Sequence, residues 1–387
     1  MGDTKIQHEV LYALCGVLYI YMTAYAIIWL EKTKRLIIKY DITAAFLCAI
    51  TLIVIGVLLG IQNSRFVLPS PSTHDQYYSP FSLGFLSNWD GTYYLAIAKH
   101  GYTTLLSAGF YPLYPLLIRV FFYIFRSYLA SALFVSWTSL VVAIYFYIKI
   151  ARELGLVNKD LARVLSVLPF ILFPTGVFLL ATYTESLFAA LALGSIYFSL
   201  RRRYIFAGVL LLLATLTHIT GIFLIILDIL LLWEQRVSFR KIAIVAALGI
   251  CGAAAFEIYL SVRYHNPFAF LESQTEVHNW LEPSYYHLLL STSLLNILFS
   301  MLLIASAAFY WDKRKSFAVY ALLFLLIPLV GKQWGGFDRY VLMAFPIPLM
   351  INEYFRDKHQ AYVVVIVITT ILWTFTLLQY AAGYIGS

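Results

Sequence analysis

An aspartate in a long polar loop of an otherwise apolar chain is the side chain best placed for chemistry. The loop reads Asn88-Trp89-Asp90-Gly91, and aromatic residues crowd it. They are Trp89, Tyr93, Tyr94, Tyr102, Phe110 and Tyr111. A charge kept next to a bilayer is costly, so Asp90 is a functional candidate. Aromatic side chains favour the membrane–water interface and pack well against flat apolar surfaces such as sugar rings. The pattern predicts an active site at a membrane surface.

The composition restricts the class of protein. Of 387 residues, 62% are hydrophobic and 12% charged, with a mean hydropathy of +0.82, beyond the range of soluble domains. Apolar runs recur at lengths that can cross a hydrocarbon core of roughly 30 Å. We predict an all-α polytopic membrane protein with about 11–13 transmembrane helices. The spans are expected near 9–30, 42–61, 128–149, 164–181, 186–200, 204–217, 221–233, 242–262, 285–310, 317–330, 340–353 and 361–381.

The pattern also divides the chain into two parts. Residues 1–41 are expected to form an extra N-terminal membrane helix, retained because no cleavage signal is seen, and a basic cytoplasmic loop. Residues 42–387 are expected to form a single transmembrane catalytic domain. Pro169 and Pro174 are expected to kink the span at 164–181. The short spans at 204–217, 221–233 and 340–353 are candidates for half-helices that meet inside the membrane.

The basic residues predict the orientation. Most of the 27 Lys and Arg residues gather in alternate loops, at 32–39, 149–163, 201–203, 236–241, 313–315 and 356–358. The positive-inside rule assigns these loops to the cytoplasm. The net charge of +8 is spread over these clusters, so it does not indicate nucleic-acid binding. Segment 111–126 has Arg119 at its centre, and an interfacial helix there keeps every cluster on one side.

The opposite face then collects the polar residues that could act on a substrate. A group transfer between lipid-linked partners needs a base, cations for a leaving phosphate, and aromatic walls. Asp90 is the candidate base, with Glu185 as the second candidate catalytic residue. Arg339 with Lys332 or His218 are the candidate cations. The other candidate substrate-binding residues are Trp89, Tyr94, His100, Tyr183, Gln274, Trp280 and Asp338.

Each candidate has a structural alternative. Asp90 could cap a helix that starts at Gly91 or Thr92, and Glu185 could pair with a cation as a structural lock. His218 could be a satisfied core histidine, and Asp338 with Arg339 could form a local ion pair. No metal site is expected, because there is no Asp-x-Asp motif and Cys15, Cys48 and Cys251 all lie in apolar segments.

Three motifs resemble those of the PIG-V family of GPI mannosyltransferases and their prokaryotic relatives (glycosyltransferase family 76). Trp89-Asp90 leads through His100-Gly101-Tyr102 to Phe110-Tyr111-Pro112. Pro174 to Phe178 leads to Tyr183-Thr184-Glu185-Ser186-Leu187-Phe188, and Asn266-Pro267-Phe268 precedes Gln274 and Trp280. The chain departs from the family pattern at His218, where the family usually has Arg.

The resemblance implies a GT-C-type glycosyltransferase fold with a large first extracytoplasmic loop that carries interfacial helices. It implies a dolichyl- or polyprenyl-phosphate mannose donor, a glycolipid acceptor resembling a GPI precursor, and inversion to an α-mannosidic bond. Asp90 would be the general base, and no cofactor or metal would be needed. The active site would be extracytoplasmic or luminal, in a cell membrane for a prokaryotic protein and in the endoplasmic reticulum for a eukaryotic one.

Two other classes of function remain open at this point. Half-helices and charges inside the membrane are also typical of a transporter or lipid flippase. A transporter would carry its polar residues at the bilayer midplane and show repeated halves, and no internal repeat is evident here. The chain could also be a non-catalytic subunit of a glycolipid-synthesis complex, and a small membrane partner subunit is conceivable.

Overall fold

The computed structural model describes residues 41–64, 83–156, 160–277, 294–331, 334 and 336–383. Several predictions fall outside these residues: the helix at 9–30, the site residues Trp280 and Lys332, and the part of the chain before the domain division at residue 41. The part of the chain that is described contains helices and no strands. The all-α class predicted from composition is therefore confirmed.

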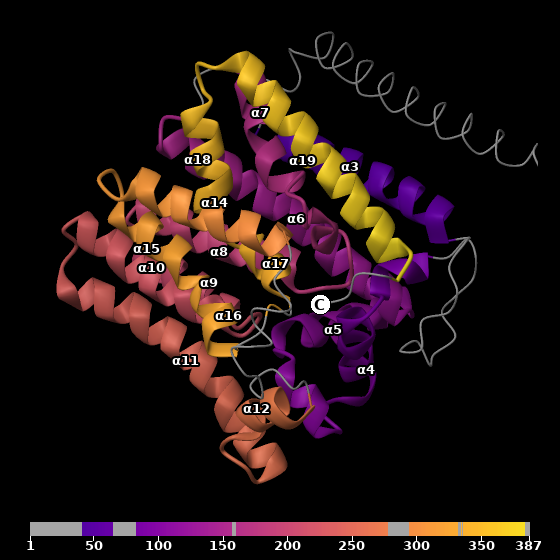
Figure 1. Ribbon diagram of the computed structural model, residues 1–387. Helices are drawn as coiled ribbons and strands as arrows, with labels where there is room; N and C mark the ends of the chain where they lie inside the picture. The colour runs from indigo at the N-terminus through magenta and orange to yellow at the C-terminus, as the bar shows by residue number, and fades with distance from the viewer. Residues whose placement is uncertain are drawn as a thin grey trace, which may run out of the picture.

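The helices follow the predicted apolar segments closely (Figure 1). In chain order they are α3 (Asp41–Ser64), α4 (Asp90–His100), α5 (Leu113–Phe125), α6 (Tyr128–Glu153), α7 (Asp160–Ile171), α8 (Glu185–Leu200), α9 (Tyr204–Thr215), α10 (Gly221–Glu234), α11 (Phe239–Tyr264), α12 (Ala269–Glu272), α14 (Leu294–Tyr310), α15 (Lys315–Leu323), α16 (Leu326–Gly331), α17 (Phe337–Val341), α18 (Pro346–Tyr354) and α19 (His359–Ala381).

Four of the described helices are long and apolar enough to cross a membrane. They are α3, α6, α11 and α19. The other apolar helices are shorter, and several predicted spans are divided: 317–330 into α15 and α16, and 340–353 into α17 and α18. The span expected at 164–181 is broken rather than kinked. Helix α7 contains Pro169 and ends at Ile171, and a short 3₁₀ turn follows at Gly176–Leu179. Pro174 explains the break, because proline disfavours helical backbone in the residue before it.

Contacts between helix termini distinguish two ends of the bundle. At one end Asp41, the first residue of α3, pairs with Arg152 and Lys149 near the last turn of α6. At the other end Asn88 donates to the backbone oxygen of Tyr380 near the end of α19. We call these the Asp41 end and the Asp90 end. In Figure 1, α19 runs beside α3 at the edge opposite α9–α11.

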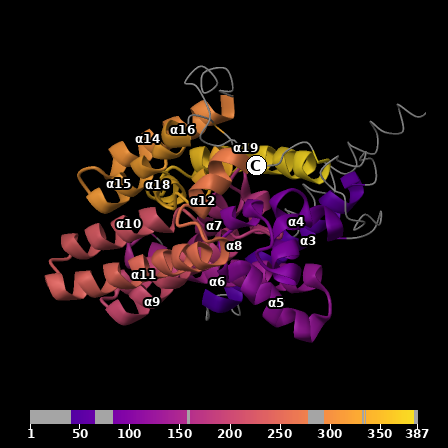
Figure 2. The ribbon, with the colours of Figure 1, turned by 90° about the horizontal axis from the view of Figure 1, so that it is seen from below.

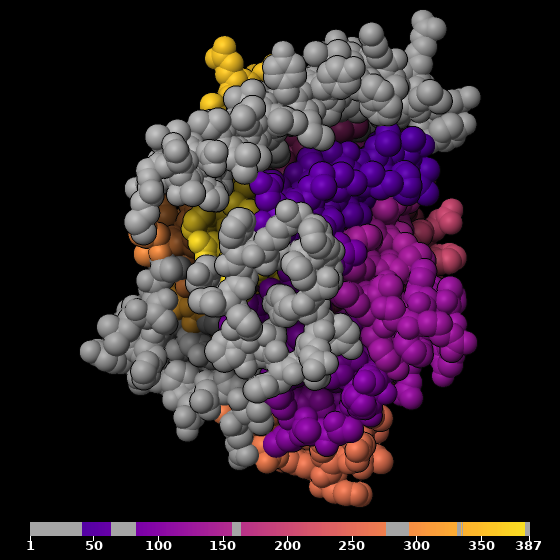
Figure 3. Space-filling view, turned by 90° about the vertical axis from the view of Figure 1, so that its right-hand side faces the viewer, coloured from indigo at the N-terminus to yellow at the C-terminus, as the bar shows by residue number. Residues whose placement is uncertain are grey.

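The pairing of α3 with α6 also decides the path of segment 111–126. Because the start of α3 contacts the end of α6, the two helices are antiparallel, and the chain between them leaves and returns at the Asp90 end. Helix α5 has 13 residues, which is about 20 Å and shorter than the hydrocarbon core. The structure therefore supports the interfacial interpretation of this segment. Figure 3 shows α3, in indigo, beside the magenta of α6.

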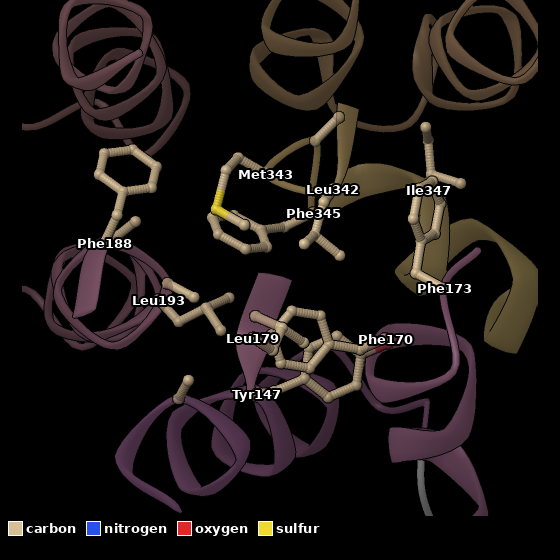
Figure 4. Close-up of a cluster of buried hydrophobic side chains, with 14 of the residues drawn as sticks. Tyr147, Phe170, Phe173, Leu179, Phe188, Leu193, Leu342, Met343, Phe345 and Ile347 are labelled. Carbon is tan, nitrogen blue, oxygen red and sulfur yellow. The ribbon is translucent and has the colours of Figure 1, made fainter. Parts of the chain in front are cut away.

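Two packed clusters hold the bundle together. In the larger one, the rings of Tyr147 on α6 and Phe170 on α7 stack with centroids 5.2 Å apart, and Phe345 meets Phe170 edge-on (Figure 4). The smaller cluster joins α4, α5 and α11, where Tyr94 and Phe256 are buried. Figure 2 shows α14, α15 and α18 on one side of α10, and α9 and α11 on the other. These layers fix the helix ends that meet around Asp90.

Candidate active site

Asp90 is the first residue of α4, directly after a strained turn. Trp89 has φ 58° and ψ −122°, a conformation that L-residues rarely adopt and that costs roughly 1–3 kcal/mol. Gly91 is needed at the next position, because a Cβ there would lie 2.5 Å from Thr182 Oγ1. The helix is flanked by Trp89, and Asp90 lies one position inside it. Asp90 is thus not at the N-cap position considered as an alternative.

Two tyrosines hold the turn by hydrogen bonds to its backbone. The backbone oxygen of Asn88 accepts hydrogen bonds from Tyr183 Oη at 3.0 Å and Tyr380 Oη at 3.3 Å. The side-chain amide of Asn88 donates to the backbone oxygen of Tyr380 at 3.2 Å. These bonds tie the start of α4 to α19 and to the residues before α8. Strain held by such surrounding contacts is typical of functional sites.

Arg339, on the short helix α17, contacts two carboxylates from other helices. Its Nη1 donates to Asp90 Oδ2 at 2.5 Å, and its Nε lies 3.1 Å from Glu185 Oε1. The second contact is an ion pair whose geometry does not align as a hydrogen bond. The exposed fractions of the three side chains are 18% for Asp90, 7% for Arg339 and 1% for Glu185. A cluster this deeply buried is costly unless its charges compensate one another.

Aromatic rings enclose the guanidinium group. The Arg339 Cζ atom lies 5.9 Å from the ring centroid of Phe178 and 5.4 Å from those of Tyr183 and Tyr340. Aromatic faces attract a cation at such distances. The two carboxylates raise the pKa of Arg339 further above its usual range, against the effect of burial. Arg339 is therefore a fixed cation at the base of the site.

A small pocket opens above this cluster, with a volume of about 70 Å³. Its polar walls include Asp90, Arg339, His218 and Gln274, which come from four separate segments. With Tyr94, five of the predicted site residues line the pocket. Its other walls are largely aromatic: Tyr94, Phe110, Tyr111, Phe270 and Tyr340 all line it. The edges of Phe110 and Tyr114 pack against the ring of Tyr94, with centroids 5.1 and 5.3 Å away.

His218 is a neutral side chain in this pocket. Burial, with Arg339 as a second cause, lowers the pKa of His218 to about 3. The Thr220 backbone N–H donates to His218 Nδ1, and the Thr220 hydroxyl lies 2.7 Å from the same atom. Since Nδ1 accepts a hydrogen bond, we assign the imidazole proton to Nε2. His218 is thus a hydrogen-bonding group and not the phosphate cation considered from the sequence.

The structure does not bring every predicted residue into the pocket. His100 is exposed at the far end of α4, ten residues and about 15 Å from Asp90. Tyr183 lies beneath the site, fully buried. Burial raises the pKa of Asp338. Among the described residues, the carboxylates that pair with Arg339 are those of Asp90 and Glu185, so the local Asp338–Arg339 ion pair is not formed. The side chain of Trp89 packs against the larger of the two packed clusters and does not line the pocket.

Sequence reasoning did not select four residues that shape the site. They are Asn88, Phe178, Tyr111 and Tyr340. Phe178 and Tyr111 lie within the recognised motifs, and Asn88 directly precedes one, which is a signal that could have identified them. Tyr340 carries no such distinction, because the chain contains 30 tyrosines.

The described residues contain no group of three or more His, Cys, Asp or Glu side chains arranged to hold a metal ion. The acidic residues of the site, Asp90 and Glu185, both contact Arg339. The guanidinium of Arg339 supplies the positive charge beside both carboxylates.

Together these features define an integral membrane protein with a charged pocket at one end of a helical bundle. The chain belongs to the mannosyltransferase (PIG-V) family, whose sequence profile matches residues 34–243. It is similar to the human GPI alpha-1,6-mannosyltransferase 2, with 35% identity over 117 residues, which are 28% of this chain and 24% of the human protein. The match thus spans about a quarter of the length of that relative.

The solved structures that align with this chain include two of one archaeal protein. The oligosaccharyltransferase of Archaeoglobus fulgidus in its apo form aligns with a TM-score of 0.48 and 13% identity, over 88% of this chain and 56% of that one. Its complex with zinc and sulfate aligns with a TM-score of 0.46 and 15% identity, over 87% and 53% of the two chains.

Proposed function

We propose that this protein is a membrane mannosyltransferase that moves mannose from a dolichyl- or polyprenyl-phosphate donor to a hydroxyl group of a glycolipid acceptor. The main observation behind this proposal is that Asp90, the carboxylate lining the pocket, is held by Arg339 within an aromatic enclosure at the Asp90 end of the bundle. Family membership supports mannose as the transferred sugar. The basic clusters at the Asp41 end support an extracytoplasmic or luminal position for the site.

In the proposed reaction the acceptor hydroxyl attacks mannose C1 from the face opposite the leaving phosphate. The new C1–O bond forms as the C1–O(phosphate) bond breaks, and the bonding electrons leave with the phosphate. This inverts the anomeric centre and leaves an α-mannosidic bond. Asp90 receives the hydroxyl proton, a role that contributes typically ~10²–10⁴-fold to the rate. A carboxylate accepts several hydrogen bonds, so the Arg339 contact at Oδ2 is compatible with one from the acceptor.

His218 would contact the sugar or the acceptor through its Nε2–H. A neutral N–H donor suits an uncharged hydroxyl or ring oxygen, and it leaves the charge of the pocket unchanged. The usual family residue at this position is a cation, so we infer that this chain holds its substrate there with a neutral hydrogen bond. Gln274, on the facing wall of the pocket, can both donate and accept a hydrogen bond.

The donor phosphate requires a cation other than Arg339. Two carboxylates already share the Arg339 guanidinium, so it has little positive charge to offer a dianion. Helix α17 has five residues, too few to add an anion site at its start. Lys332, the other cation selected from the sequence, remains the proposed phosphate ligand.

The test is a transfer assay on the purified full chain in detergent or lipid. Labelled dolichyl phosphate mannose is the donor, and the total lipid extract of the native membrane supplies the acceptor. We expect labelled lipid product, no product from GDP-mannose, and unchanged turnover in EDTA. Loss of transfer in EDTA with recovery in magnesium or manganese would contradict the proposed metal-independent site. Absence of transfer with either donor would contradict the function.

A further inference from the structure

We propose that Glu185 is a positioning residue that fixes Asp90 by acting through Arg339, and that it does not touch the substrate. The inference rests on the proposed role of Asp90 as the base, and it assigns the second candidate catalytic residue to a different task.

The burial of Glu185 separates it from the reaction. Glu185 is the first residue of α8 and is completely buried. It is absent from the walls of the pocket, which Asp90 and Arg339 both line. Its Oε1 faces Arg339 Nε, and its Oε2 receives a long contact from Thr184 Oγ1 at 3.5 Å. A carboxylate in this position cannot exchange protons with a bound sugar.

Arg339 can transmit the position of Glu185 because of its shape. The guanidinium is planar and carries its donors in fixed directions, so holding Nε also sets the direction of Nη1. Nε faces Glu185 and Nη1 faces Asp90. The enclosing rings of Phe178 and Tyr183 limit movement out of this plane.

The contact joins three segments that are distant in sequence. Glu185 belongs to α8, Arg339 to α17 and Asp90 to α4. Helix α17 is anchored by Thr175 Oγ1, which donates to the backbone oxygen of Asp338 at 3.0 Å, and it begins after Gly336, whose φ is 68°. With the backbone of α17 fixed, Glu185 determines where the guanidinium lies relative to Asp90.

The variants Glu185→Gln and Glu185→Ala distinguish positioning from catalysis. Glutamine keeps an oxygen that can face Arg339 Nε, so we expect turnover to fall less than about tenfold, because the geometry is retained. Alanine leaves Nε without its carboxylate, and we expect turnover to fall roughly 10–100-fold with the KM for the donor little changed. Asp228→Asn is the matched control: Asp228 is also fully buried, where it accepts from Ser195 Oγ at 2.6 Å and Ser199 Oγ at 2.8 Å. It should alter stability and not the turnover of folded protein.

A double-mutant cycle tests transmission through Arg339. In an Arg339→Ala background, Glu185→Ala should cost little further turnover, because the residue that connects it to Asp90 is gone. Equal fold losses in both backgrounds would overturn the proposal. So would a Glu185→Gln loss as large as that of Asp90→Asn, since Glu185 would then take part in the reaction.

A stability measurement separates this inference from the proposed function. Melting temperatures of Glu185→Ala, Asp90→Asn and their combination should be coupled when Arg339 is present and additive when it is Ala. If the wild-type chain transfers no mannose but this coupling is seen, the function is wrong and the positioning stands. If coupling between positions 185 and 90 persists without Arg339, the positioning is wrong whatever the activity.

Discussion

The two ends of the bundle use charge in different ways. At the Asp41 end, Asp41 pairs with Lys149 and Arg152, and the exposed fractions of these cation side chains are 25% and 36%. The pairs Arg201–Glu153 and Lys313–Glu353 lie at the same end and are also solvated. At the Asp90 end, the side chain of Arg339 is only 7% exposed and two carboxylates share it.

This difference indicates which charges serve the fold and which serve chemistry. The pairs at the Asp41 end join helix termini, as between α3 and α6, where water can relax around them. They need only keep the basic loops on one side. The cluster at the Asp90 end is held under strained backbone at Trp89, where burial of charge is expensive and apolar packing would be as stable. We attribute this cluster to the proposed role of Asp90 as a base.

The largest expected effect is at Asp90. Asp90→Asn keeps the size of the side chain and an oxygen toward Arg339 but removes the proton acceptor. Turnover of dolichyl phosphate mannose per folded molecule should fall ~10²–10⁴-fold, with a smaller loss of stability because the buried Arg339 loses one of its two carboxylate partners. Near-normal turnover in this variant would contradict the proposal that the Asp90 end carries the catalytic base.

Arg339→Lys should have the next largest effect. The ammonium keeps the charge but cannot face Asp90 and Glu185 in two fixed directions, as the guanidinium does. We expect turnover to fall roughly 10–100-fold through misplacement of Asp90, measured with saturating donor. A variant that loses donor affinity and keeps its turnover would indicate that Arg339 binds the phosphate after all.

Asp41→Asn tests the opposite end and should reverse this pattern. Removing one partner leaves Lys149 and Arg152 without their shared carboxylate, but water can solvate both cations, so stability should fall by roughly 1–2 kcal/mol. Turnover per folded molecule should stay within about twofold, because the change lies at the far end of α3. Arg201→Ala, at a more exposed pair, is the control and should cost less than about 1 kcal/mol.

His218 gives a smaller effect that depends on pH. Its pKa is lowered to about 3 in the folded protein from 6.5, so only the unfolded chain binds the proton as the pH falls below 6.5. The folded state therefore loses stability on acidification, by about 2 kcal/mol at pH 5. His218→Gln should show a smaller drop in unfolding midpoint between pH 7 and pH 5 than the wild type. An equal drop would show that His218 is protonated in the folded protein.

Much of the fold could be predicted from the sequence because lipid imposes a simple rule. Apolar runs and basic clusters located α3, α6, α11 and α19 and grouped the helix ends. The interfacial interpretation of α5 rests on the cost of placing Arg119 in lipid and on keeping every basic cluster on one side. The break after Ile171 was not predicted, since the competition between a kink and a full stop at Pro174 depends on tertiary packing.

The sequence predicted which residues form the candidate site better than it predicted how they contact one another. Topology alone gathered Asp90, Glu185, His218 and Arg339 on one side, and the structure brings all four together. Topology could not indicate that Arg339 pairs with carboxylates, because that pairing depends on where α17 lies relative to the start of α8. The charge state of His218 also follows from burial, which no motif records.

The most direct test of the account is mass spectrometry of lipid-linked glycans from membranes with and without this protein. We expect a glycolipid lacking one mannose to accumulate when the protein is absent. Wild-type protein should restore the missing mannose, Asp41→Asn should restore it in proportion to folded protein, and Asp90→Asn should not restore it. Identical glycolipids in the presence and absence of the protein, or full restoration by Asp90→Asn, would contradict the assignment of the Asp90 end as the site of mannosyl transfer.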